Sequence, residues 1–352
     1  MEILAPSETG LRRAAGVLAA GGLVAFPTET VYGLGGDAWN SRALALIFEV
    51  KGRPAFDPLI VHVASRVSVD LVADLDALSP RGRAAAAALM EEFWPGPLTL
   101  VLPKRPRVPE LATSGLPTVA IRIPDHPVAR ALIELSTGAV AAPSANPFGY
   151  LSPTRAEHVA SQLGDRVDLI VDGGRCPVGV ESTVVDVTGP VPLVLRPGGI
   201  ALERLRAVVP GIELIDRTDP APRSPGQLAN HYAPRLPLRL VRRGGLALAR
   251  PSGRAAALVY DGIGRERLGA ASDRFALVRV LSEAGYPVEA AANLFDILHD
   301  LDSGDFDELW AERVPEEGLG AAVNDRLYKA SKKIGGSNSR PSGGGGFQSF
   351  GV

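Results

Sequence analysis

The chain has 352 residues and a mass of 36.8 kDa, more than one hydrophobic core usually serves, so two domains are expected. Hydrophobic residues make up 46% and charged residues 22%, as in globular proteins, and a formal net charge of −2 argues against a generally basic protein that coats nucleic acid. One cysteine, scattered histidines and the lack of a long apolar stretch exclude a disulfide framework, zinc-ligand spacing and a membrane span, so we expect a cytoplasmic protein.

A polar loop is predicted after the first apolar stretch. Residues 23–26 favour a short buried strand, and Pro27 ends it because proline has no N–H to give to a sheet. Residues 28–32 bring two threonines, a glutamate and a tyrosine, and the glycines in residues 33–36 permit close backbone approach or a positive φ. We therefore expect a loop whose glycines let the backbone turn beneath a substrate.

The next elements carry cationic and polar side chains at their ends. A helix that begins near residue 40 is expected to end at Gly52, which places Lys51 in its last turn and Arg53 in the loop that follows. A strand over residues 59–63 carries His62. A helix over residues 81–94 and a strand over residues 98–102 are expected next.

The clearest alternation in the sequence lies in residues 118–123. The odd-numbered positions are apolar, whereas the even-numbered positions carry Thr118 and Arg122. Because side chains alternate across a strand, one face is expected to pack in the core and the other to present these polar groups.

A second polar loop follows residues 139–142, a strand of small residues. The next helix is expected to begin at residues 152–154, with Glu157 at capping-box distance from Thr154. Further strands are expected over residues 169–171, 182–187 and 193–195. Strands and helices are mixed rather than strictly alternating, which predicts an α/β or α+β domain with a curved, mixed sheet.

The composition changes to proline, arginine and asparagine near residue 218. No hydrophobic period survives up to residue 237, and beyond it strands are predicted over residues 238–241, 256–260 and 275–280, with helices over 288–300 and 319–333. We therefore divide the chain into a first domain over residues 1–216, a linker over 217–237, a small α/β domain over 238–334 and a disordered tail over 335–352.

Several candidate site residues stand at the ends of these elements. The cations are Lys51, Arg53, Arg122 and Arg196. The uncharged donors are Ser144, Asn146 and Ser182. Each cation alone is typical of a surface or ion-pair residue, His62 alone of a packed histidine and Thr30 alone of a turn hydroxyl, but together they indicate a pocket for an anion. The sequence contains neither a P-loop motif nor a G-x-S-x-G motif.

Four short motifs resemble the YrdC-like family in their order along the chain. They are PTETVYGL at residues 27–34, KGRP at 51–54, PSAN at 143–146 and STV at 182–184. The motifs RPG at 196–198 and HYAP at 231–234, with a second α/β domain after them, look like the two-domain L-threonylcarbamoyladenylate synthases of that family. Asp57 departs from the family, which often has asparagine before Pro-Leu, and its carboxylate would repel phosphate unless Arg53 or a metal offsets it.

This resemblance implies a reaction and a set of site residues. L-threonine, bicarbonate and ATP would give threonylcarbamoyl-AMP and pyrophosphate, for modifying adenosine next to the anticodon of certain tRNAs. The implied catalytic residues are Lys51 and Arg53. The implied ATP-binding residues are Arg53, Asp57, Thr118, Ser144, Asn146, Ser152, Arg196 and Tyr232. The implied L-threonine-binding residues are Thr30, His62, Arg122, Ala142 and Ser182.

The implied chemistry requires positioned charges rather than a protein nucleophile. A carbamate oxygen attacks the α-phosphate, and Mg²⁺ is expected to bind through the phosphates rather than through protein ligands. The resemblance also brings Tyr232 and the linker back over the nucleotide, in a concave basic cleft, and gives the second domain a small Rossmann-like fold. A downstream threonylcarbamoyl transferase that acts on tRNA is an expected partner, whereas a membrane and stable direct nucleic-acid binding are not.

Two other functions stay open at this point. A concave basic surface also suits an RNA-binding module, although the net charge and the lack of interleaved aromatic residues argue against that role. Hydrogenase-maturation proteins use a related domain for carbamoyl transfer, but this sequence lacks the zinc-finger cysteines and the acylphosphatase segment of those larger proteins.

Overall fold

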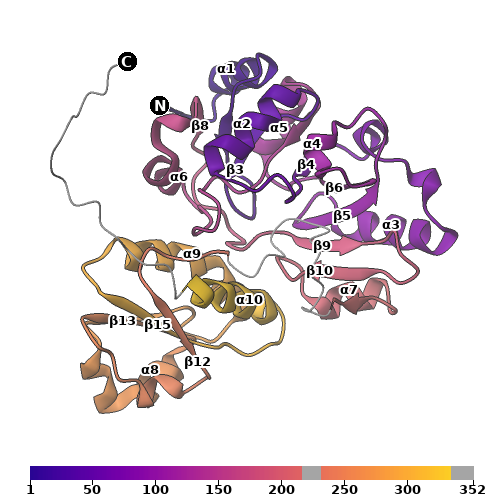
Figure 1. Ribbon diagram of the computed structural model, residues 1–352. Helices are drawn as coiled ribbons and strands as arrows, with labels where there is room; N and C mark the ends of the chain where they lie inside the picture. Colours follow the sequence, from indigo (N-terminus) through magenta and orange to yellow (C-terminus); the bar gives the residue numbers. More distant parts are fainter. Residues whose placement is uncertain (216–230, 334–352) are drawn as a thin grey trace, which may run out of the picture.

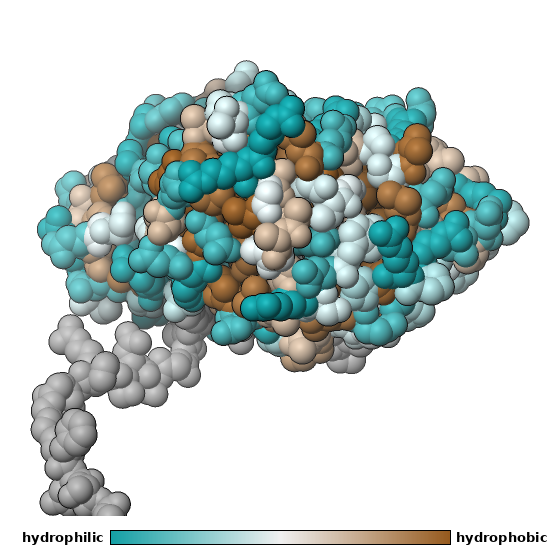
Figure 2. Space-filling model, turned by 90° about the horizontal axis from the view of Figure 1, so that it is seen from above, coloured by the Kyte–Doolittle hydropathy of each residue, from teal (hydrophilic) through white to brown (hydrophobic). Residues whose placement is uncertain are grey.

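The computed structural model describes residues 1–215 and 231–333, which form two units, each built on a β-sheet (Figure 1). Most of the expected linker over residues 217–237 and the expected tail over residues 335–352 lie outside the described residues. No helix in the described ranges is long and apolar enough to cross a membrane. Hydrophilic and hydrophobic residues are interleaved on the face seen from above (Figure 2).

The first unit is organised around a mixed sheet. Its strand order is β1–β8–β2–β3–β7–β4–β6–β5–β9–β10–β11, and both parallel and antiparallel pairs occur, as β4 with β6 and β4 with β7 show. The strands are β1 (Glu2–Leu4), β2 (Val24–Phe26), β3 (Gly33–Asp37), β4 (Ile60–Val63), β5 (Leu98–Pro103), β6 (Thr118–Arg122), β7 (Ala139–Ala141), β8 (Leu169–Val171), β9 (Thr183–Asp186), β10 (Leu193–Arg196) and β11 (Glu213–Leu214). The predicted mixed α/β class is confirmed.

Helices cover this sheet. They are α1 (Glu8–Ala19), α2 (Ser41–Lys51), α3 (Pro80–Phe93), α4 (Glu110–Thr113), α5 (Pro127–Leu135), α6 (Ala156–Leu163) and α7 (Leu202–Val208), with short 3-10 turns η1 (Val67–Leu71), η2 (Leu75–Ala77) and η3 (Gly164–Arg166). The side chain of Asn40 accepts hydrogen bonds from the first backbone N–H groups of α2, and Gly52 ends the helix with a φ of 61°. The predicted limits of this helix are therefore confirmed.

The second unit has a parallel sheet in the order β12–β15–β13–β14. Its elements are β12 (Leu238–Val241), η4 (Gly245–Leu248), β13 (Ala255–Val259), α8 (Gly262–Leu268), η5 (Gly269–Arg274), β14 (Leu277–Val280), α9 (Pro287–Ser303), β15 (Glu308–Glu312), α10 (Gly320–Ala330) and η6 (Ser331–Lys333). We did not predict β15, although it lies inside this sheet. Its end residues Glu308 and Glu312 are buried because they accept hydrogen bonds from backbone N–H groups, including those of Ser252 and Gly244.

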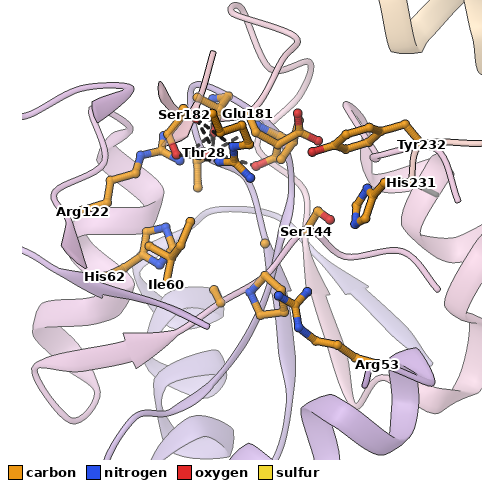
Figure 3. Close-up of a pocket in the computed structure, with 16 residues that line it drawn as sticks. Thr28, Arg53, Ile60, His62, Arg122, Ser144, Glu181, Ser182, His231 and Tyr232 are labelled. Atoms are coloured by element: carbon orange, nitrogen blue, oxygen red, sulfur yellow. Dashed lines mark hydrogen bonds between the residues drawn. The ribbon is translucent and has the colours of Figure 1, made fainter. Parts of the chain in front are cut away.

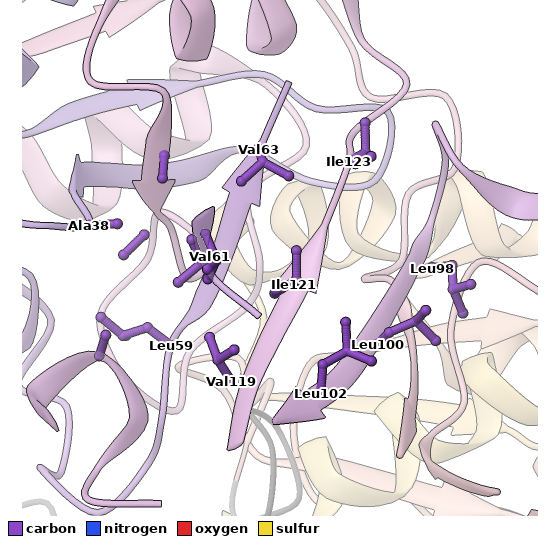
Figure 4. Packing of buried hydrophobic residues seen from close by; sticks show 14 of the residues in the cluster. Ala38, Leu59, Val61, Val63, Leu98, Leu100, Leu102, Val119, Ile121 and Ile123 are labelled. Atoms are coloured by element: carbon purple, nitrogen blue, oxygen red, sulfur yellow. The ribbon is translucent and has the colours of Figure 1, made fainter. Parts of the chain in front are cut away.

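The main core of the first unit packs against one face of its sheet. The apolar positions of β6, Val119 and Ile121, lie beside Val61 of β4 and Leu100 of β5 (Figure 4). Arg122 therefore points to the other face, as the alternation in residues 118–123 predicts.

The expected loop over residues 33–36 is wrong, because this segment is strand β3, antiparallel to β2. None of its glycines has a positive φ. A Cβ atom at Gly35 would lie 2.7 Å from Cε1 of Phe26 and 2.9 Å from Cγ1 of Val140. The glycines therefore permit close packing against neighbouring strands rather than a turn.

The expected capping box at Thr154 is also wrong. Helix α6 begins later, after Arg155, and its first turn has no side-chain cap. The hydroxyl of Thr154 instead donates to Oδ1 of Asp296, at 3.0 Å, on α9 of the second unit. A contact between the two units has thus replaced a local one.

Helices α9 and α10 lie between the second sheet and the first unit (Figure 1). Asp296 of α9 also pairs with Arg155 at 2.8 Å and with Arg175 at 3.0 Å. The hydrophobic cluster of the second unit includes Val31 and Val180 from the first. The two units therefore share buried apolar surface as well as ion pairs.

Candidate functional site

One polar pocket lies on the face of the first sheet opposite the main core. The space between its walls is about 520 Å³, which includes space open to solvent. Its walls come from the β2–β3 connection, the strands β4 and β6, the loop after β7, the start of β9 and the end of β10 (Figure 3). The lining residues are Thr28, Thr30, Val31, Gly33, Arg53, Ile60, His62, Arg122, Ala142, Pro143, Ser144, Glu181, Ser182, Arg196, His231 and Tyr232.

The nitrogen-bearing side chains of the pocket are distributed over its two ends. His62 and Arg122 lie on one side, whereas Ser144 and Arg53 lie on the other (Figure 3). His62 and Arg122 are direct partners in the parallel pairing of β4 with β6, so the sheet itself places them together. The pocket can therefore hold an anionic group at each end.

Arg122 is fixed by the β2–β3 connection. Its Nη1 donates to Oγ1 of Thr30 at 2.8 Å, and its Nη2 lies 2.6 Å from Oε1 of Glu29. Its Nε donates to the carbonyl oxygen of Gly96 at 3.3 Å. A guanidinium has five N–H groups, so at least one remains on each terminal nitrogen, as needed for a carboxylate that accepts two bonds.

His62 is neutral at physiological pH. Burial, and then the positive charge of Arg122, lower its pKa to about 3. Its Nδ1 is buried and has no hydrogen-bond partner among the described residues. A neutral imidazole beside a guanidinium offers hydrogen bonding to a polar ligand without adding a second charge.

Arg53 compensates the negative charge of Asp57. Its Nη2 lies 2.9 Å from Oδ2 of Asp57 in a buried ion pair. Its Nε donates to the carbonyl oxygen of Asp57 and its Nη2 to that of Pro58. The adjacent cation therefore offsets the carboxylate that replaces the family's asparagine.

Lys51 does not line the pocket in this structure. Its buried Nζ donates to the carbonyl oxygens of Ser144 and Asn146, and burial, followed by the charge of Arg53, holds its pKa well below the ordinary value. A direct contact between Lys51 and a phosphate would require these bonds to break. In this geometry Lys51 fixes the loop that presents Ser144.

Arg196 reaches the pocket from the end of β10. Its Nη2 donates to Oγ of Ser182 at 3.1 Å and to the carbonyl oxygen of Ser182 at 2.9 Å. Oγ of Ser182 also lies 2.7 Å from Oγ1 of Thr99, within hydrogen-bond distance. The hydroxyl of Ser182 is thus oriented by two neighbours.

The pocket brings together most of the predicted site residues. Those that line it are Thr30, Arg53, His62, Arg122, Ala142, Ser144, Ser182, Arg196 and Tyr232. The others are placed outside the lining: Lys51, Asp57, Thr118, Asn146 and Ser152.

Three of these residues outside the lining either donate hydrogen bonds to neighbouring groups or lie at the far end of a strand. The side-chain Nδ2 of Asn146 donates to the carbonyl oxygens of Pro147 and Tyr150. The hydroxyl of Ser152 donates to Glu181. Thr118 pairs with Pro103 at the opposite end of β6 from Arg122.

The sequence did not predict three polar lining residues, Thr28, Glu181 and His231. Thr28 and His231 lie inside motifs that the resemblance already used, so their position next to Thr30 and Tyr232 was an available signal. Glu181 directly precedes the STV motif, but a single glutamate carries no local signal of a site. In the described ranges no group of three or more His, Cys, Asp or Glu residues could hold a metal ion.

The fold and pocket define a two-unit α/β protein with basic side chains at two ends of one pocket. The family model described as telomere recombination, for Sua5, YciO and YrdC proteins, matches residues 16–198, and the model described as threonylcarbamoyl-AMP synthase, C-terminal domain, matches residues 200–332. Threonylcarbamoyl-AMP synthase of Pyrococcus abyssi is 42% identical over 92% of this chain and 94% of that protein. The Bacillus subtilis protein of the same name is 40% identical over 93% of this chain and 94% of that protein.

A solved structure of a relative supports the same family. The crystal structure of P. abyssi Sua5 complexed with L-threonine matches with a TM-score of 0.83 at 39% identity, and the match covers 94% of this chain and 98% of that one. The chain therefore belongs to the Sua5/YrdC family, in the two-domain form whose members are named threonylcarbamoyl-AMP synthases.

Proposed function

We propose that this enzyme is a nucleotidyltransferase that makes threonylcarbamoyl-AMP from L-threonine, bicarbonate and ATP and releases pyrophosphate. The observation that carries this proposal is a single pocket with Arg122 and His62 at one end and Arg53 at the other. Its relatives are named for this activity, and the crystal structure of the P. abyssi relative is a complex with L-threonine.

We assign L-threonine to the Arg122 end. The two remaining N–H groups of Arg122 suit the threonine carboxylate, and Thr30 and Glu29 hold the guanidinium in place. His62, Ser182 and the backbone of Ala142 line the same region and would contact the hydroxyl and amine.

We assign ATP to the end that carries Arg53, Ser144, Arg196 and Tyr232. The threonine amine and bicarbonate form a carbamate and water. An oxygen of the carbamate then attacks the α-phosphorus, and the bond to pyrophosphate breaks. The chain's contribution is to align the two ligands and stabilise the developing phosphate charge, because the reaction needs no protein nucleophile.

Mg²⁺ would enter as part of the MgATP substrate, bound through phosphate oxygens. The buried carboxylates at the pocket are already paired, Glu29 with Arg122 and Asp57 with Arg53, so they do not form a ready metal site. We further propose a cytoplasmic location and transfer of the product to an enzyme that modifies tRNA.

The test is pyrophosphate release with each substrate omitted in turn. We expect release to require ATP, L-threonine and bicarbonate together, and mass spectrometry to detect threonylcarbamoyl-AMP. Release that ignores threonine would refute the assignment. Serine in place of threonine serves as a control for the side-chain methyl group.

A further inference from the structure

Helix α10 of the second unit places a cation against two residues that line the pocket. The side chain of Arg326 is completely buried, at 0% exposure. Its Nε donates to Oε2 of Glu181 at 2.8 Å, and its Nη1 donates to Oδ2 of Asp325 at 2.7 Å. Because Glu181 lines the pocket, the second unit reaches the site through this contact.

Arg326 also contacts Tyr232. The guanidinium carbon lies 4.9 Å from the centroid of the Tyr232 ring, and Nζ of Lys329 lies 5.9 Å from it. Tyr232 is buried and has a φ of 64°, a left-handed conformation that bulky residues rarely adopt. The surroundings must therefore hold it there, and Arg326 is part of them.

Arg326 helps to keep Glu181 in its negatively charged form. Burial alone would raise the pKa of Glu181, but the charges of Arg326 and Arg196, with a hydrogen bond from Ser152, keep it below its ordinary value. Glu181 is therefore an anion inside a pocket that we assign to anionic ligands. Without Arg326, this carboxylate would lose its direct ion-pair partner and its fixed orientation.

Other contacts between the units provide a comparison. Asp296 of α9 pairs with Arg155 and Arg175, and none of these three residues lines the pocket. They can hold the units together without touching the site. Arg326 differs because it contacts Glu181 of the first unit and Tyr232 of the linker, and both of these residues line the pocket.

We propose that Arg326 is a positioning residue for the ATP end of the pocket. From the second unit it fixes Glu181 and Tyr232 in the wall that faces the nucleotide. This inference rests on the proposed function, because that function assigns ATP to this end.

The test compares full-length variants. Arg326→Met removes the charge at similar length, Arg326→Lys keeps the charge without the planar fork, and Asp296→Asn is the matched control in the same interface. The Michaelis constants for ATP and L-threonine and kcat are measured by pyrophosphate release, ATP affinity by calorimetry, and the free energy of unfolding by urea denaturation. The double variant Arg326→Met, Glu181→Gln removes the unpaired buried carboxylate if the single variant does not fold.

We expect Arg326→Met to raise KM and Kd for ATP by about tenfold or more, the loss typical of a charged hydrogen bond, while KM for threonine changes by less than about threefold. Arg326→Lys should recover part of this loss. The double variant should fold and still bind ATP weakly, because Tyr232 has lost its support. Asp296→Asn should reduce stability with near-normal ATP affinity.

Equal effects of Arg326→Met and Asp296→Asn on ATP affinity would overturn the inference, since Arg326 would then act only as a link between the units. Normal ATP affinity in the double variant would overturn it as well. A wild-type chain that binds ATP but forms no threonylcarbamoyl-AMP would refute the proposed function alone, because the calorimetric ATP affinities of the variants would still decide the role of Arg326.

Discussion

Arg122 pairs with Glu29 and still offers two N–H groups to a ligand, a combination that a lysine could not provide. Its planar guanidinium contacts Glu29, Thr30 and the Gly96 carbonyl, and it keeps at least one N–H on each terminal nitrogen for a ligand. The position of this residue follows from the strand alternation, but its contact with Glu29 depends on how β6 lies relative to the β2–β3 connection.

We therefore expect Arg122→Lys to raise KM for threonine by about tenfold or more, because an ammonium cannot replace two parallel charged hydrogen bonds. The lysine still compensates the charge of Glu29, so folding should be retained. Steady-state pyrophosphate release measures the effect, with KM for ATP as the internal reference. A larger rise in KM for ATP than for threonine would mean that the two ends of the pocket are assigned the wrong way round.

His62 makes stability depend on pH. Its pKa is about 3 in the folded chain but near 6.5 when unfolded, so the unfolded state binds the proton first as the pH falls. The contribution of His62 to the free energy of unfolding is therefore fully present above about pH 6.5. It decreases as the pH falls toward 3, by about 2 kcal/mol at pH 5. His62→Gln should remove about this much of the difference between the free energies of unfolding at pH 7.5 and pH 5, measured in urea. An unchanged pH dependence would show that His62 takes up its proton at the same pH in the folded and the unfolded chain.

At the scale of elements, β3 depends on glycine because its neighbours leave no room for a Cβ atom. We expect Gly35→Ala to destabilise the chain by about 1–3 kcal/mol, since the added carbon would press on Phe26 and Val140. Gly16→Ala is the control, because Gly16 lies in α1 with nothing within 4 Å of the added atom and should gain about 0.5–1 kcal/mol from helix propensity. Urea denaturation compares the two. Similar stability changes in both variants would disprove the packing role of Gly35.

Local signals explain which elements the sequence predicts. Helix α2 has both limits in its own residues, Asn40 and Gly52. Strand β15 does not, because its buried glutamates find partners such as Ser252 and Gly244, 56 and 68 residues away. The same holds for the site: Arg122 stands out from its alternation, whereas the contact of Glu181 with Arg326 joins residues 145 apart and leaves no pattern in either segment.

At the scale of the whole molecule, the two units are packed closely enough for one glycine to matter. Gly179 has a φ of 73°, and a Cβ atom there would lie 2.5 Å from both Cα and O of Ala292 in α9. Because these are backbone atoms, the helix itself would have to move. Movement of α9 would also disturb Phe295, whose ring packs 5.7 Å from that of Tyr232 in the pocket wall.

Gly179→Ala should therefore weaken ATP binding as well as stability, although Gly179 does not line the pocket. We expect KM for ATP to rise by at least about threefold and hydrogen exchange in α9 to increase, because the backbone clash displaces the helix and Phe295 with it. Gly138→Ala is the matched control, since Gly138 has a φ of 79° and nothing within 4 Å, so it carries the same backbone strain without the clash. If both variants lose equal stability and keep normal KM for ATP, the packing of α9 against the first unit does not shape the site.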